Sequence, residues 1–140
     1  MIGGAGERRT LRVVARYADW WNADYYTPSE YGRKLDILRH HCTAIGRDPD
    51  SIVPTYYAAV SLSRDPDARV ANLPFSHRTD LSAVSGTPDD VTRQLAAFAA
   101  LGVQHVQLSF LDFPDPSGLE LFLGDVLPRF SRITQQARRA

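Results

Sequence analysis

Four stretches of the chain carry apolar residues at the spacing of an amphipathic helix. The clearest follows Thr27-Pro28-Ser29-Glu30, a capping box with proline at the first helical position, and ends at Gly46. A second capping signal, Thr87-Pro88, begins a helix that ends at Gly102. The two other helices are expected over residues 7–18 and 119–130.

Runs rich in aromatic and β-branched residues lie between these helices and favour strands. They cover residues 19–22, 52–62 and 103–110, with apolar residues that we assign to both faces of a sheet. Strands that alternate with helices indicate a parallel sheet with crossover helices. Residues 63–85 fit no clear element, and we expect them to form a long excursion within a single α/β domain.

Length and composition narrow the classes of protein that this chain can be. A complete eight-stranded α/β barrel needs roughly 250 residues, and the chain has 140. Its 16 basic and 16 acidic residues give no net charge, so we expect neither nucleic acid nor a membrane surface as a partner. The chain has one cysteine, Cys42, and no apolar run long enough for a membrane span, and both features favour a reducing cytosol.

The glycine-rich segment Gly3-Gly4-Ala5-Gly6, followed by Arg8, is the first candidate for a binding site. Glycines between a strand and a helix expose backbone N–H groups, and the helix N-terminus adds partial positive charge, so the segment can hold a phosphate. Arg8 or Arg9 offers a charged contact. A tight turn alone would also explain these glycines. Because at most two strand residues precede Gly3, Met1 is expected to be an internal position of a longer protein or the start of a truncated one.

Residues 2–22 closely resemble a signature segment of the luciferase-like monooxygenases, in the branch of oxidoreductases that depend on coenzyme F-420. In that branch a Gly-Gly-x-Gly-Glu loop precedes a Thr-Leu-Arg helix and an Ala-Asp-x-x-Asn strand. This chain carries the three motifs at Gly3–Glu7, Thr10–Arg12 and Ala18–Asn22. The resemblance continues through residues 35–49, 86–90, 102–103 and 119–128.

The resemblance implies the C-terminal half of a TIM-type (β/α)8 barrel. It also implies that F-420 or FMN binds at the carboxyl ends of the strands, with its phosphate at Gly3, Gly4, Ala5 and Gly6, beside a small-molecule substrate. Members of the family are about twice as long, and their N-terminal half supplies the usual catalytic side chains. No catalytic residue can therefore be assigned here, and a catalytically inactive half barrel is the alternative.

Four further residues stand at the expected carboxyl ends of strands, where barrel active sites are built, and are candidates for lining a pocket: Asn22, Ser61, Ser109 and Phe110. We interpret His105 as structural, and Trp20 and Trp21 as residues that fill the barrel.

Three consecutive residues, His40, His41 and Cys42, have the side chains of metal ligands. Successive helical residues point about 100° apart, so these three cannot converge and no metal site is expected. Asp112 and Asp115 are close in sequence, but their proline-containing loop favours a turn over a paired-carboxylate site.

Half a barrel would leave its inner face and two sheet edges uncovered. We expect the inner face to be apolar and therefore to need a partner. Two copies could pair as a homodimer, another chain could supply the complementary half barrel, or the excursion could fold back as a lid. We favour the homodimer.

Overall fold

The computed structural model describes residues 1–66 and 84–137. The strands in this part of the chain are β1 (Ile2–Gly3), β2 (Trp20–Asp24), β3 (Val53–Leu62), β4 (Val84–Gly86) and β5 (His105–Phe110). The helices are α1 (Thr10–Tyr17), α2 (Pro28–Ala44), α3 (Pro88–Ala100), α4 (Ser117–Leu121) and α5 (Leu127–Ala137). A 3₁₀ turn, η1 (Pro49–Ser51), precedes β3, and a π-helical segment, η2 (Phe122–Val126), joins α4 to α5.

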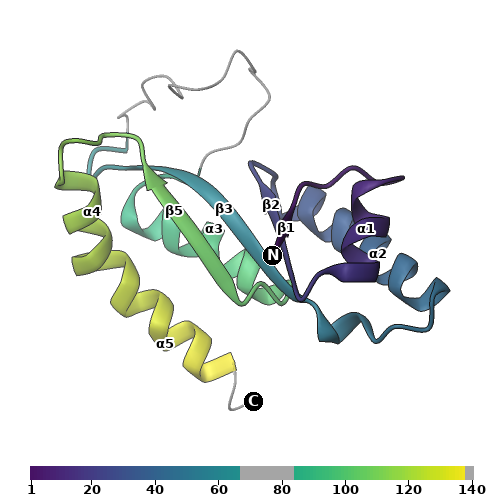
Figure 1. Ribbon diagram of the computed structural model, residues 1–140. Helices are drawn as coiled ribbons and strands as arrows, with labels where there is room; N and C mark the ends of the chain where they lie inside the picture. Colours follow the sequence, from purple (N-terminus) through teal and green to yellow (C-terminus); the bar gives the residue numbers. More distant parts are fainter. Residues whose placement is uncertain (67–83, 138–140) are drawn as a thin grey trace.

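All pairings between these strands are parallel, as the alternation of strands and helices predicts. β3 is the long central strand, with β2 on one edge and β5 on the other (Figure 1). Val60 pairs with Phe110 of β5 and also with Val84 of β4, so β4 continues the edge of β3 that β2 occupies. The order β1-β2-β3-β5 places four strands side by side in chain order, as in a (β/α) barrel.

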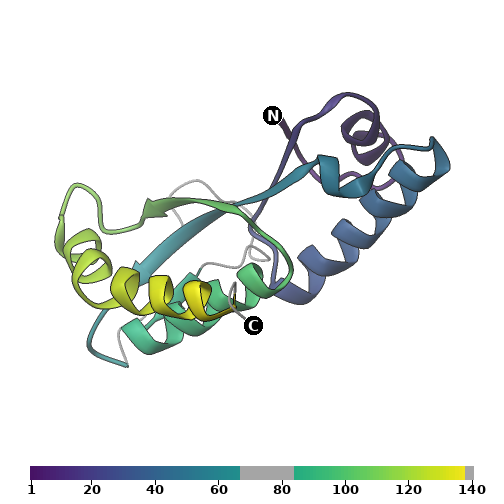
Figure 2. The same cartoon turned by 90° about the horizontal axis from the view of Figure 1, so that it is seen from below.

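One face of the sheet is packed against helices, with α3 and α5 running side by side beneath it in Figure 2. Trp21 of β2 and Tyr56 of β3 point to this face and are fully buried. The Trp21 ring stacks on Tyr31 of α2 at 5.0 Å between centroids, and the Tyr56 ring stacks on Phe98 of α3 at 3.9 Å. These aromatic contacts join the sheet to the helical layer and form the centre of the hydrophobic core.

The opposite face of the sheet is mostly polar, whereas we had expected apolar residues to dominate both faces. Successive strand residues point to opposite sides, so the residues between the core positions all face away from the helices. Eight of them are polar: Asn22 and Asp24 of β2, Thr55, Tyr57 and Ser61 of β3, and His105, Gln107 and Ser109 of β5. Trp20 of β2 and Val53 and Ala59 of β3 are the apolar residues on this face. The expected reason for a partner, an uncovered apolar face, is therefore wrong for the described strands.

The capping boxes predicted from sequence are both present. Thr27 and Glu30 cap α2, and Thr87 and Asp90 cap α3, each with reciprocal side-chain and backbone hydrogen bonds. Differences occur where local signals are weak. α1 begins at Thr10 rather than at residue 7, and the last helical region begins at Ser117 rather than at residue 119.

The strand β4 lies inside the segment that was expected to be an irregular excursion. Three residues are too few to show a strand period, so only the pairing with β3 reveals it. Residues 67–83 of the expected excursion lie outside the described residues.

Candidate functional site

The glycine-rich loop directly follows β1 and lies at the carboxyl end of the strands. Gly3 is in register with Asn22 of β2. The N–H of Gly4 donates to the Asn22 carbonyl at 2.9 Å, and the Gly4 carbonyl accepts from the Trp21 indole nitrogen at 2.9 Å. Gly4 has a φ of +101°, a conformation that favours glycine. Two hydrogen bonds to β2 thus hold the loop at the end of the sheet.

The next two residues retain free backbone donors. Within residues 1–66 and 84–137, the N–H groups of Ala5 and Gly6 have no hydrogen-bond partner. A Cβ at Gly6 would lie 2.8 Å from Oγ1 of Thr10, so the chain needs glycine for this close approach to α1. The N-terminus of α1 also lacks a side-chain cap. These amides and the helix end together form a place where an anion is favourable.

Glu7, between the loop and α1, forms hydrogen bonds with residues of helix α2. Its carboxylate accepts from Lys34 and from Arg33, each at 2.6 Å, and its carbonyl accepts from Nε2 of His41 at 2.8 Å. The hydrogen bond from Lys34, followed by that from Arg33, lowers the pKa of Glu7. Arg8, the charged contact expected for a phosphate, is exposed to solvent.

The polar face of the sheet adjoins this loop. In register across the strands, Thr55 of β3 lies between Asn22 of β2 and His105 of β5, and the Oγ1 of Thr55 donates to the Oδ1 of Asn22 at 2.9 Å. Ser61 and Ser109 lie on the same face nearer the carboxyl ends. Three of the four expected pocket-lining residues, Asn22, Ser61 and Ser109, are therefore on one open surface.

Phe110 does not lie on this surface and corrects the expected set. Its ring packs edge-on against Phe122 of η2 at 5.7 Å, and it adjoins the hydrophobic core. Ser109 and Phe110 are neighbours in a strand and so must face opposite ways. Position near a strand end was the reason for choosing both, and that criterion ignores the alternation.

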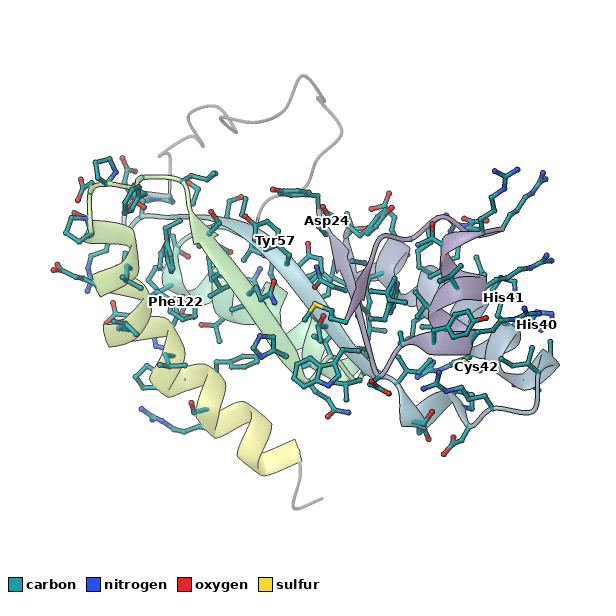
Figure 3. The ribbon with its side chains drawn as sticks, viewed as in Figure 1. Asp24, His40, His41, Cys42, Tyr57 and Phe122 are labelled. Atoms are coloured by element: carbon teal, nitrogen blue, oxygen red, sulfur yellow. The ribbon has the colours of Figure 1, made fainter. Side chains whose placement is uncertain are left out.

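The sequence analysis missed a polar group formed by Asp24, Tyr25 and Tyr57. It lies two residues beyond Asn22 and Thr55, toward the carboxyl ends of β2 and β3. Asp24 pairs in register with Tyr57, and the two lie close together in Figure 3. Tyr25 has a φ of 57°, rare for a non-glycine residue, and its ring meets Tyr57 edge-on at 5.6 Å. Burial, reinforced by a hydrogen bond with Tyr57, raises the pKa of Tyr25. A two-residue step outward from Asn22 would have identified Asp24.

This group can exchange hydrogen bonds with a bound molecule. A phenol both donates and accepts, and an ionised carboxylate accepts. The free amides of the loop can therefore hold an anion at one end of the site. The two phenols on the polar surface can orient an oxygen-bearing compound at the other end.

The residues that resemble metal ligands diverge, as their helical spacing predicts. Cys42 is buried in the core, His41 bonds to the Glu7 carbonyl, and His40 is exposed (Figure 3). Among the described residues, no three His, Cys, Asp or Glu side chains come together in a way that could hold a metal ion. Asp112 and Asp115 accept from the backbone N–H groups of Gly118 and Ser117, at the start of α4.

None of the helices in the described ranges combines the length and apolar character needed to cross a membrane.

No family model matches the chain. Among curated proteins, the phthiodiolone/phenolphthiodiolone dimycocerosates ketoreductases of Mycobacterium tuberculosis and Mycobacterium kansasii are 38% identical over 60 residues. That match covers 42% of this chain and 16% of each relative. The chain therefore matches only a small part of the length of these relatives.

Solved structures match almost the whole chain. The coenzyme F420-dependent tetrahydromethanopterin reductase of Methanopyrus kandleri has a TM-score of 0.70 at 16% identity, over 91% of this chain and 50% of that one. An F420-dependent secondary alcohol dehydrogenase has a TM-score of 0.69 at 15% identity, over 91% of this chain and 47% of that one. A long-chain alkane monooxygenase has a TM-score of 0.67 at 14% identity, over 93% of this chain and 40% of that one.

The chain has the fold of half a TIM-type barrel. It spans half or less of each of these structures, and at such low identity the likeness concerns the fold.

Proposed function

We propose that this chain is part of a luciferase-like oxidoreductase that uses coenzyme F-420 or FMN and binds the cofactor phosphate at Gly3, Gly4, Ala5 and Gly6. The observation that carries the proposal is the pinned loop. Gly4 is bonded on both sides to β2, while the amides of Ala5 and Gly6 have no partner in the described part of the chain. An anion at the start of α1 would accept from these amides.

The names of similar proteins support the choice of cofactor. Two of the matching structures are F420-dependent enzymes, and a third is a riboflavin lyase with a modified FMN. The 60-residue match to mycobacterial ketoreductases adds a relative that acts on ketones. Fold likeness alone does not determine chemistry, so the proposal depends on the loop and on the resemblance of residues 2–22.

The chain's own residues would bind and orient, while F-420 or FMN would supply the hydride chemistry. The amides of Ala5 and Gly6 would hold the phosphate, and the exposed Arg8 would add a positive charge nearby. Asn22, Ser61 and Ser109 would line the site. The hydroxyls of Tyr25 and Tyr57 would hydrogen-bond an oxygen atom of a small-molecule substrate.

Binding of the cofactor is the direct test. We expect saturable fluorescence changes when the chain is titrated with F-420 or with FMN. The variant Gly6→Ala should bind more weakly, because its Cβ would meet Thr10 at 2.8 Å. Gly124→Ala, in η2 and outside the proposed site, places its Cβ in open space and should bind normally. No saturable binding of either cofactor, to the chain alone or with a complementary chain, would remove the proposal.

A second candidate is a half barrel that has lost turnover and persists as a homodimer or beside a complementary half-barrel chain. The observation that favours it is the strand order, because four adjacent strands from each of two copies would complete an eight-stranded barrel. Since the open face is mostly polar, strand pairing at the edges of β1 and β5, rather than burial of apolar surface, would hold the halves together.

Two measurements separate these candidates. Light scattering at micromolar concentration should report a dimer if two copies complete the barrel, and a stable monomer would contradict self-association. An assay of reduced-cofactor oxidation by the purified chain should show no turnover if activity has been lost, and measurable turnover would refute the inactive half barrel.

A further inference from the structure

A hollow of about 300 Å³ lies between α1 and α2, away from the polar face of the sheet. Two of its lining residues, the buried Ala15 and the exposed Ala44, have short side chains. Its walls are basic. The complete lining is Arg12, Ala15 and Arg16 of α1, His40, His41 and Ala44 of α2, and Ile45 at the end of α2.

The two arginines are aligned and have no opposite charge. Arg12 and Arg16 are four residues apart, so they lie on the same side of α1 and repel each other. Neither forms an ion pair within the described residues, whereas Arg33, Arg39, Arg93 and Arg129 each contact a carboxylate. In a chain with no net charge, this local excess of positive charge needs an explanation.

The histidine side of the hollow is held in place. A carbonyl oxygen only accepts, so Nε2 of His41 donates to the Glu7 carbonyl, at 2.8 Å. The Glu7 carboxylate is directed at Arg33 and Lys34 and does not line the hollow. His41 is half-buried and His40 is exposed beside it at the outer end of α2 (Figure 3). No acidic residue is among the lining residues.

We propose that this hollow is a second anion site, which binds a small, multiply charged oxyanion such as phosphate or a phosphate ester. Guanidinium groups donate two parallel hydrogen bonds to such oxygens, and a bound anion would relieve the repulsion between Arg12 and Arg16. The site differs from the glycine loop in its chemistry, because side chains rather than backbone amides supply the donors. It lies on the outside of the half barrel and does not depend on the function proposed above.

Nuclear magnetic resonance can report the two anion sites separately in this 15.6 kDa chain. The chain is titrated with inorganic phosphate and with pyrophosphate at constant pH and ionic strength, which removes general charge screening. The ring signals of His40 and His41 report the hollow, and the amide signals of Ala5 and Gly6 report the glycine loop. We expect saturable shifts of the ring signals, with pyrophosphate binding more tightly than phosphate.

The double variant R12Q/R16Q should weaken binding in the hollow roughly tenfold or more, which is about 1.4 kcal/mol. The matched control is R93Q/R132Q, which removes the same charge from exposed positions on α3 and α5 and should leave the affinity unchanged. All four arginines are exposed, so folding should be retained, and the amide spectrum checks this.

Three results would overturn the proposal: ring signals that do not saturate into the tens of millimolar range, an equal loss of affinity in the control, or binding that survives R12Q/R16Q. Shifts confined to the Ala5 and Gly6 amides would leave the glycine loop as a phosphate site and reject the hollow. Shifts confined to the ring signals would support the hollow and count against the proposed cofactor site.

Discussion

The ammonium group of Lys34 lies 2.6 Å from a carboxylate oxygen of Glu7, across 27 positions of the sequence. Lys34 is the chain's single lysine, and its side chain is only 11% exposed, whereas that of Glu7 is 40% exposed. The pair joins the segment after the glycine loop to helix α2, two turns before α2 reaches His41. Glu7, which belongs to the Gly3–Glu7 motif of the expected cofactor site, therefore also has a structural role that the motif does not predict.

The variant Glu7→Gln should lower the free energy of unfolding at neutral pH, because it removes the charge that Lys34 and Arg33 contact. The pKa of Glu7 is lowered from its ordinary value of 4.5, so the carboxylate stabilises the fold above that pH and the stabilisation is lost as the pH falls through the lower folded value. Urea denaturation at pH 7 and at progressively acidic pH should show the difference between wild type and variant shrinking.

Glu120→Gln is the control for this measurement. Glu120 is exposed and forms no ion pair in the described ranges, so its replacement should change stability little at either pH. A difference between wild type and Glu7→Gln that persists unchanged in acid would show that charge is not its cause.

The variant Trp21→Phe should destabilise the chain by about 1–3 kcal/mol, because the partly buried carbonyl of Gly4 would lose its partner. Trp20→Phe removes an indole from the open face, where Trp20 is 39% exposed, and should cost less. Unfolding in urea, followed by far-ultraviolet circular dichroism, measures both. Equal losses would argue against a special role for the bond between Trp21 and the loop.

The variant Phe98→Ala should cost about 3–5 kcal/mol, because it removes the ring that stacks on Tyr56 and leaves a cavity beneath the central strand. Phe113→Ala is the comparison, since Phe113 is 84% exposed and should change stability by no more than about 0.5 kcal/mol. A thermal melt of each variant reports the order. Similar melting temperatures would place the core elsewhere.

The Cys42 thiol should react slowly in the folded chain. Burial raises its pKa above the ordinary value of 9.0, and the reactive form is the thiolate. A chromogenic disulfide reagent at pH 8 should modify Cys42 far faster in denaturant than in buffer. Rapid modification without denaturant would mean that α2 opens readily from the core.

Local signals in the sequence were sufficient for several elements. The capping boxes at Thr27 and Thr87 are built from residues three positions apart, so the hydrogen bonds that start α2 and α3 can be inferred without any knowledge of distant contacts. The alternation of strands and helices likewise predicts parallel pairing, which the register of β1, β2, β3 and β5 confirms.

The composition of each sheet face required the tertiary structure. Phe110 and Ser109 stand together at a strand end, and nothing local states which of them faces the helices until Tyr56 and Val60 are seen in the core. The short strand β4 forms because Val84 pairs with Val60, which is 24 positions earlier in the chain. The cluster of Asp24, Tyr25 and Tyr57 forms because register brings β2 and β3 together.

The sequence by itself determined where the capped helices α2 and α3 begin, that the strands run parallel, and that a glycine-rich turn precedes α1, because capping, hydrophobic periodicity and glycine conformations act over a few neighbouring residues. Only the tertiary structure decided that the open face is mostly polar, that Glu7 forms an ion pair with Lys34, and that Arg12 and Arg16 line a hollow together with two histidines. Those relationships join residues far apart in the chain, and packing of the core sets which of them meet.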